Sequence, residues 1–216
     1  MKIDMHVHTY LSPDALTTPR EMEKILKTRK IDCVCITDHD TVKAWEKFKH
    51  LNIIQGVERT IIEDNGNKFH LLCYFLNEEI KSQNFDEVID SVREQDGFCS
   101  IAHPFDTPRK APSDIELYYK KVDALECLNS RTRIKNGNEM ALNYAKLHEL
   151  GRTAGSDAHH YTEIGNAYVE CDCTDLEEFR NKLKKNEIEI QGKSFIYPWV
   201  RIYSIGRKMG LLKPNF

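Results

Sequence analysis

Two histidines separated by a single residue, His6 and His8, close a short apolar run near the start of the chain. Alternate side chains of an extended segment point to the same side, so both imidazoles face one way and can bind the same metal ion. Asp14 follows in the next loop and adds a carboxylate, although an aspartate there can also simply form a turn. The pair predicts a metal site at the end of the first strand.

Histidine and acidic residues recur where other apolar runs end. Asp38 and Asp40 flank His39, so this histidine can bind a metal while a carboxylate orients it or deprotonates a water molecule. Asp40 can equally cap the helix that follows. Further candidates at such positions are Glu58, His70, His103, Glu126, Asn129, Asp157 and His159.

Each of these residues has an ordinary structural explanation when it is taken alone, but their shared position does not. The carboxyl ends of parallel strands are where α/β barrels assemble their active sites. Mixed imidazole and carboxylate ligands favour zinc, manganese or iron over calcium. The candidates also outnumber the ligands that one tetrahedral ion can use, so the sequence predicts two to three divalent metal ions.

Short apolar runs alternate with amphipathic segments along the chain, which predicts a mainly parallel sheet in a doubly wound or barrel arrangement. An Asn65-Gly66 turn predicts a β-hairpin between 60–62 and 69–76. Thr18 and Pro19 mark the start of the first helix. The other expected strands are 2–7, 32–37, 52–58, 98–102, 122–128, 152–155 and 167–171, and the other expected helices are 41–49, 85–95, 112–119, 138–150 and 175–186.

The composition excludes several classes of protein. The 216 residues suit one domain, and 31 Lys and Arg against 34 Asp and Glu provide no general basic field for nucleic acid. No apolar run is long enough for a membrane span, and no secretory signal is visible, so we expect a cytoplasmic protein. The seven cysteines lie mostly in apolar runs without the spacing of zinc modules, so we expect reduced, buried thiols.

The last part of the chain differs from the rest. Residues 191–216 contain five basic residues, several aromatic residues and no acid. We expect a catalytic domain over 1–190, with 191–216 packed on that same domain. Two alternatives remain open: the aromatic and basic side chains could stack bases and contact phosphates, or the segment could form a helix on a membrane surface.

In order along residues 3 to about 160, the sequence resembles the PHP family, the polymerase and histidinol phosphatase superfamily. The resemblance implies a distorted seven-stranded (β/α) barrel and a trinuclear metal centre. It is carried by His6-Val7-His8, Ser12 to Asp14, Thr37-Asp38-His39-Asp40, Gly56-Val57-Glu58, His70, Ala102-His103-Pro104 and Gly155-Ser156-Asp157-Ala158-His159.

The resemblance also implies a role for each ligand. The first metal ion would be held by His6, His8, Glu58 and Asp157. Glu58 would bridge to a second ion, which is bound by His70 and His103. The third ion would be bound by Asp14, His39 and His159, with His160 as the alternative to His159.

Such ions polarise a phosphoryl oxygen and lower the pKa of a bound water toward ~7, so the expected reaction is hydrolysis of a phosphate ester. In-line displacement also needs cations around the phosphate. We expect Arg109, Arg131 or Arg133 to supply one, together with Asn129, although each arginine could instead lie solvated on the surface. No glycine-rich phosphate loop is present, so no nucleotide cofactor is expected.

The sequence therefore predicts a metal-dependent phosphoesterase that acts on a small phosphomonoester, such as a nucleotide or a metabolite phosphate. One alternative is an exonuclease or end-trimming phosphatase on short RNA or DNA, as found among members of the family that it resembles. An alternative of another class is a non-catalytic, metal-binding regulatory module. The sequence does not indicate an oligomeric state.

Overall fold

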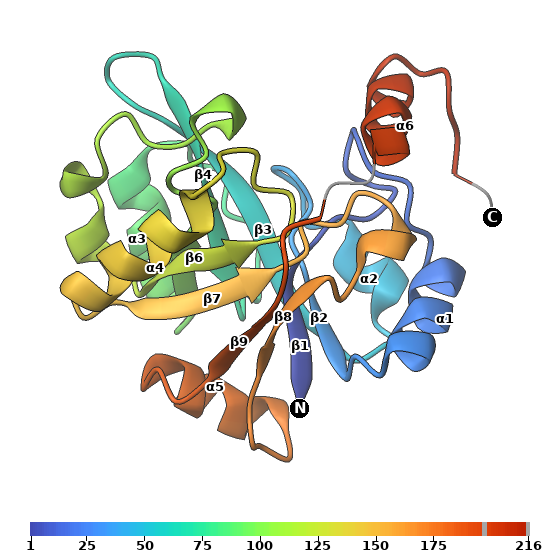
Figure 1. Ribbon diagram of the computed structural model, residues 1–216, viewed down its shortest axis with the longest axis horizontal. Helices are drawn as coiled ribbons and strands as arrows, with labels where there is room; N and C mark the ends of the chain where they lie inside the picture. Colours follow the sequence, from blue (N-terminus) through green and yellow to red (C-terminus); the bar gives the residue numbers. More distant parts are fainter. Residues whose placement is uncertain (196–197, 215–216) are drawn as a thin grey trace.

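The computed structural model of the chain describes residues 1–195 and 198–214 (Figure 1). A single nine-stranded sheet has the order β7-β6-β5-β4-β3-β2-β1-β8-β9. Its strands are β1 (Lys2–Val7), β2 (Cys33–Ile36), β3 (Ile53–Ile62), β4 (Lys68–Tyr74), β5 (Phe98–Ile101), β6 (Ala124–Asn129), β7 (Gly151–Gly155), β8 (Ala167–Glu170) and β9 (Glu189–Gly192).

The two ends of the β1–β7 series meet, which makes this part of the sheet a distorted barrel. Beyond β7 the chain bridges to β1 in parallel, where Asp157 N donates to His6 O at 2.7 Å and His8 N donates to Ala158 O at 2.9 Å. Gly155 permits this contact, because a Cβ there would lie 2.3 Å from the Cβ of His6. The barrel expected from the sequence is confirmed.

The number of strands differs from the expected seven. β8 pairs antiparallel with the beginning of β1, through Lys2 and Glu170, and β9 pairs antiparallel with β8. The first residues of β1 pair with β8, whereas its last residues contact the segment that follows β7. β8 and β9 therefore extend the sheet beyond the barrel. β9 spans residue 190, so the expected boundary between 1–190 and 191–216 falls within a strand.

The hairpin is present, but its first arm is not a separate strand. β3 runs without a break from Ile53 to Ile62, and β4 returns antiparallel with His70 opposite Thr60. β4 is also antiparallel to β5. The start of β4 therefore lies at the barrel end where the parallel strands finish, and His70 is carried to that end.

Most helices lie along the outside of the barrel, and the last one stands at one of its ends (Figure 1). The first begins with a capping box, in which Thr18 and Glu21 bind each other's backbone N–H groups. The helix expected over 112–119 is wrong: Asp114 is extended and accepts from Glu116 N, and only two short 3-10 turns follow. The helices are α1 (Pro19–Arg29), α2 (Ala44–Phe48), α3 (Phe85–Glu94), α4 (Gly137–Leu147), α5 (Leu176–Lys184) and α6 (Pro198–Lys208), the last unexpected.

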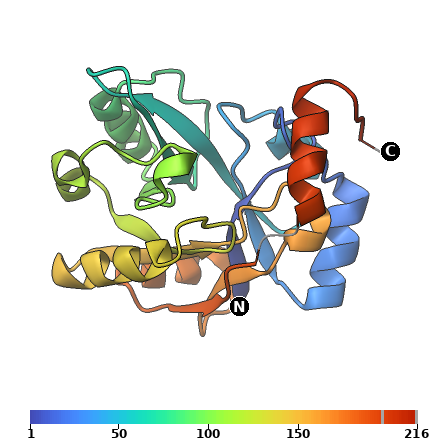
Figure 2. The ribbon, with the colours of Figure 1, turned by 45° about the horizontal axis from the view of Figure 1, so that its top comes forward.

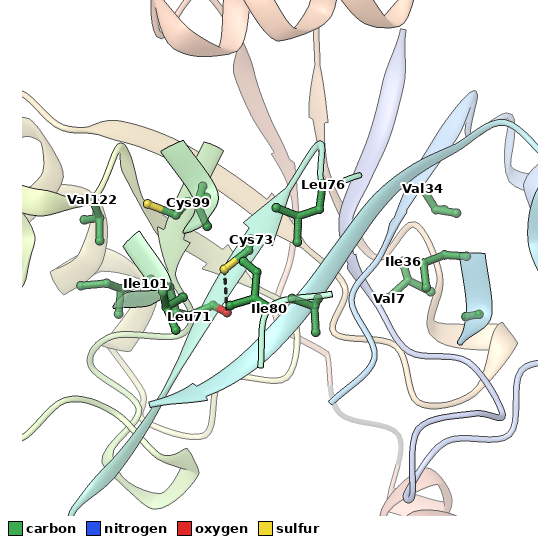
Figure 3. Packing of buried hydrophobic residues seen from close by; sticks show 14 of the residues in the cluster. Val7, Val34, Ile36, Leu71, Cys73, Leu76, Ile80, Cys99, Ile101 and Val122 are labelled. Carbon is green, nitrogen blue, oxygen red and sulfur yellow. Dashed lines mark hydrogen bonds between the residues drawn. The ribbon is translucent and has the colours of Figure 1, made fainter. Parts of the chain in front are cut away.

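Alternate strand residues form two apolar layers. One layer lies between the strands and the surrounding helices, as Figure 3 shows for Val34, Ile36, Leu71 and Cys73. The other fills the barrel interior with residues such as Met5, Cys33, Leu72 and Phe98, and α5 packs against it through Phe179 and Leu183. All seven cysteines are free thiols, and six are buried, as expected. Within the described residues, no helix combines the length and apolar character needed to cross a bilayer.

Candidate metal centre

The nine candidate ligands meet at one end of the barrel, and we call them the ligand cluster. They come from the ends of β1, β2, β5 and β7, from the middle of β3, from the first half of β4 and from the loop after β1. Asp157 and His103 have positive φ angles of 55° and 32°, an uncommon conformation for residues with a side chain. The ligand cluster consists of His6, His8, Asp14, His39, Glu58, His70, His103, Asp157 and His159.

The first group surrounds the end of β1. The Nε2 atoms of His6 and His8 lie 3.1 Å apart. Glu58 places its two carboxylate oxygens 3.5 Å from His6 Nε2 and 3.3 Å from His8 Nε2, and Asp157 Oδ1 lies 3.8 and 3.5 Å from the same nitrogens. Ligands on a zinc-like ion with bonds of 2.0–2.1 Å lie roughly 3.0–3.4 Å apart. These four side chains therefore have the spacing of a shared ion.

Glu58 lies at the centre of the ligand cluster and is buried. Its Oε1 is 2.8 Å from His70 Nδ1 and 3.4 Å from His103 Nε2, and its Oε2 is 2.8 Å from His39 Nδ1. Burial alone would raise the pKa of Glu58, but the surrounding histidines hold that pKa well below its usual range. Burial lowers the pKa of His70 to about 4, which favours the neutral imidazole that binds metals.

Asp14 anchors the outer part of the ligand cluster. Its Oδ2 lies 3.4 Å from His159 Nε2 and 3.6 Å from His39 Nε2. Ser12 Oγ donates to the other carboxylate oxygen at 3.2 Å. The alternative ligand His160 points elsewhere, because its Nδ1 is 2.9 Å from Thr162 Oγ1. The structure thus brings His159, and not His160, to Asp14.

Buried polar atoms without partners show that these residues fit metal ions. Several buried polar atoms of the ligand cluster have no hydrogen-bond partner among the described residues, because the atoms near them do not meet hydrogen-bond geometry. Burying such atoms is costly unless a cation or another partner satisfies them. They are both carboxylate oxygens of Glu58, Oδ1 of Asp157, Nδ1 of His39, and both ring nitrogens of His70 and of His103.

Three overlapping groups have ligand atoms that all lie within 4.8 Å of one another: His6-His8-Glu58, His8-His39-His159 and His39-Glu58-His70. Because His8, His39 and Glu58 each belong to two groups, the ligand cluster has the geometry of several adjoining ion positions. The division of ligands among individual ions stays a prediction.

Glu126 is a candidate functional residue, named at a strand end from the sequence but given no role there. Its Oε1 lies 2.9 Å from His6 Nδ1, while its Oε2 accepts from His103 N at 2.8 Å and from Asn129 Nδ2 at 2.9 Å. A carboxylate on one ring nitrogen of histidine directs the other nitrogen toward a metal. The available signal was an acid in the middle of the otherwise apolar segment Ala124–Leu128.

We expect Glu126→Gln to weaken metal binding by about 10- to 100-fold. An amide has one accepting oxygen, so at least one of the three groups on Glu126 would face an NH2 group. Titration with manganese or zinc against a competing chelator measures the effect, and Glu94→Gln on the exposed side of α3 is the matched control. Equal affinities for the two variants would contradict this role.

Two of the three candidate arginines approach the ligand cluster. Arg109 forms a close ion pair with Asp157 through Nη2, and its Nη1 donates to Asn129 Oδ1 at 3.1 Å. Arg131 is buried and donates to Asp157 O at 3.2 Å. Arg133 is exposed, and its backbone N donates to Asp106. All three arginines line a pocket of about 330 Å³ above the ligand cluster.

Asn129 connects the acidic residues of the site to its arginines. Its amide nitrogen donates to Glu126 and, at 3.0 Å, to Asp157 Oδ2, while its oxygen accepts from Arg109 and from Arg131 N. These contacts position the acidic and basic groups around it. Direct binding of substrate by Asn129 stays a prediction.

The two aspartates beside His39 hold neighbouring backbone segments. Burial raises the pKa of Asp38 to about 6, and its carboxylate accepts from the N–H and hydroxyl groups of Thr9, both at 2.6 Å. Asp40 binds Arg59 Nη1 and the N–H and hydroxyl groups of Thr60, each at 2.8 Å. A catalytic role for either aspartate stays a prediction.

Comparison with known proteins agrees with this geometry. Residues 4–147 match the family described as PHP domain, and residues 135–188 match the family described as PHP-associated. A curated protein of Methanocaldococcus jannaschii, named only as uncharacterized, is 33% identical over 96% of this chain and 90% of its own length.

Solved structures with little sequence identity share the fold. A two-domain protein of Bacteroides vulgatus, described as containing a predicted PHP-like metal-dependent phosphoesterase, superposes with a TM-score of 0.72 at 16% identity, over 96% of this chain and 69% of its own. The lesion-specific endonuclease Q of Pyrococcus furiosus has a TM-score of 0.63 at 20% identity, over 88% of this chain and 57% of its own. Endonuclease Q has also been solved with a 27-mer duplex that carries an abasic lesion at its active site.

Proposed function

The chain belongs to the PHP-domain family of metal-dependent phosphoesterases, and from this premise we propose that it hydrolyses a small phosphomonoester, a nucleotide or metabolite phosphate. A water oxygen bonds to phosphorus, the ester P–O bond breaks, and the alcohol leaves with a proton. The observation that carries the proposal is the convergence of nine candidate ligands beneath a small pocket lined by arginines.

We assign the ligand cluster to two or three divalent ions of zinc, manganese or iron. When bound, such ions polarise a phosphoryl oxygen and make a water molecule acidic enough to act as a nucleophile near neutral pH. The first set is His6, His8, Glu58 and Asp157. The second is Glu58, His70 and His103, and the third is Asp14, His39 and His159.

The arginines orient both the ligands and the substrate in this proposal. Arg109 contacts Asp157 and Asn129 and also lines the pocket. Its guanidinium is therefore already held in position before substrate binds. Arg131 is fixed by Asp157 O and lines the same pocket. Fixed cations of this kind stabilise the charge that develops on equatorial phosphoryl oxygens.

The test is elemental analysis of the purified protein, combined with assays after metal removal and reloading with manganese, zinc or iron. The expected result is two to three ions per chain and metal-dependent release of phosphate from p-nitrophenyl phosphate and from mononucleotides. Less than one ion per chain, without recovery on reloading, would contradict the site. Tight metal binding without turnover on a broad panel would favour the regulatory module.

Short RNA or DNA is the alternative substrate. The observation in its favour is that Trp199 and Tyr203 are 36% and 42% exposed on α6, the helix that borders the pocket, where they could stack bases. This alternative requires cleavage of 5′- or 3′-labelled oligonucleotides to exceed hydrolysis of mononucleotides and to fall steeply with added salt.

A further inference from the structure

Helix α6 lies outside both segments of the chain that match known families, yet it borders the pocket above the ligand cluster. In Figures 1 and 2, α6 stands at the barrel end where the loop after β1 runs. Three of its residues, Ser204, Ile205 and Lys208, line the pocket. A segment that the family matches do not cover therefore forms part of the wall of the candidate active site.

Contacts at both ends hold α6 in this place. Near its start, Val200 is buried and the Trp199 ring meets the His160 ring edge-on at 4.8 Å. Near its end, Arg207 Nη2 donates to Tyr10 O at 3.1 Å. Because His160 directly follows a candidate ligand and Tyr10 belongs to the loop that carries Asp14, α6 is attached to the elements that build the ligand cluster.

Lys208 reaches the ligand cluster itself. Its Nζ lies 2.9 Å from Asp14 Oδ2, the same oxygen that is near His39 and His159. The Lys208 side chain is 58% exposed, so its ammonium group lies at the boundary between the pocket and the ligand cluster. A flexible four-carbon stem lets the group turn from Asp14 to another anion without movement of the backbone.

Ser204 lies one helical turn before Lys208, so the two side chains share a face of α6. Ser204 lines the pocket, and its buried hydroxyl oxygen has no hydrogen-bond partner within the part of the chain that the structure describes. A buried hydroxyl without a partner is costly and suits a site where a ligand completes its hydrogen bonding. A hydrogen-bond donor and a cation thus lie on one helix face in the wall of one pocket.

We propose that Lys208 and Ser204 bind the phosphate group of the substrate, so that α6 is a specificity-determining wall of the active site. This inference rests on the proposed function, because a phosphate held against the ligand cluster lies within reach of the Lys208 ammonium. Lys208 exchanges Asp14 for a phosphate oxygen when substrate enters, and Ser204 donates to a second oxygen.

The first test compares full-length Lys208→Gln with wild-type protein, both loaded with manganese. We expect the KM for p-nitrophenyl phosphate and the inhibition constant for inorganic phosphate each to rise about tenfold, while kcat falls less than threefold. Ser204→Ala should raise both constants about threefold. Lys208→Arg should stay within threefold of wild type, because it retains the charge.

Lys213→Gln is the matched control, since Lys213 is an exposed lysine of the same segment. It should leave KM, kcat and phosphate inhibition unchanged. Elemental analysis of each variant measures metal content, which we expect to equal that of wild type. Unchanged phosphate inhibition in Lys208→Gln would overturn the proposal. If that variant also bound an extra metal ion, the role of Lys208 would be to compete with metal for Asp14.

The phosphate site on α6 can be tested separately from the proposed hydrolysis. If wild-type protein hydrolyses no ester, calorimetric titration of the manganese-loaded protein with inorganic phosphate still tests the α6 site. Weaker binding by Lys208→Gln than by Lys213→Gln would support phosphate binding by α6 in a protein without turnover. Equal binding by these two variants would overturn it.

Discussion

Glu58→Gln is expected to reduce metal-dependent hydrolysis by at least about 10³-fold. Glu58 is the only described side chain whose two oxygens approach histidines from every part of the ligand cluster: His6, His70 and His103 on one side, and His8 and His39 on the other. Glutamine keeps the shape but replaces one anionic oxygen by an NH2 group that cannot bind a cation. Neighbouring ions would therefore lose their shared ligand.

Elemental analysis and steady-state kinetics of the variant check this expectation. We expect the metal content to fall by at least one ion per chain, while circular dichroism stays that of wild type. Glu94→Gln, exposed on α3, is the control for the substitution itself. Wild-type turnover and metal content in Glu58→Gln would exclude Glu58 as a bridging ligand.

Metal removal is expected to lower the thermal stability of the protein. The buried ligand atoms that have no hydrogen-bond partner among the described residues would gain a partner when ions bind. Binding at 100 times the dissociation constant contributes about 2.7 kcal/mol, which corresponds to roughly 5 to 10 °C in Tm for a chain of this size.

Thermal melts of chelator-stripped protein, with and without manganese or zinc, measure this shift. In Glu58→Gln the shift should be smaller, whereas in Lys213→Gln it should equal that of wild type. A stripped protein that melts at the same temperature after reloading would indicate that the ligand cluster does not bind these ions in the native state.

Local signals predicted much of the fold. Apolar runs, turn residues and the Thr18 cap located the strands and most helices, since these depend on periodicity and neighbouring residues. The helix expected over 112–119 was wrong because local side-chain contacts of Asp114 keep the chain from continuing a helix. α6 was not among the helices expected from the sequence, and most of its large apolar side chains are exposed.

The sequence by itself determined which residue types could bind metals and that they follow the strands, because strand ends can be read from apolar runs. Only the tertiary structure decided which of them meet. The antiparallel direction of β4 carries His70 to Glu58, the β7–β1 closure brings Asp157 to His6, and β6 places Glu126 behind His6. The two contacts of His6 depend on barrel closure over more than 100 residues of chain. The His70–Glu58 contact depends on the register of the hairpin, so no local pattern encodes any of the three.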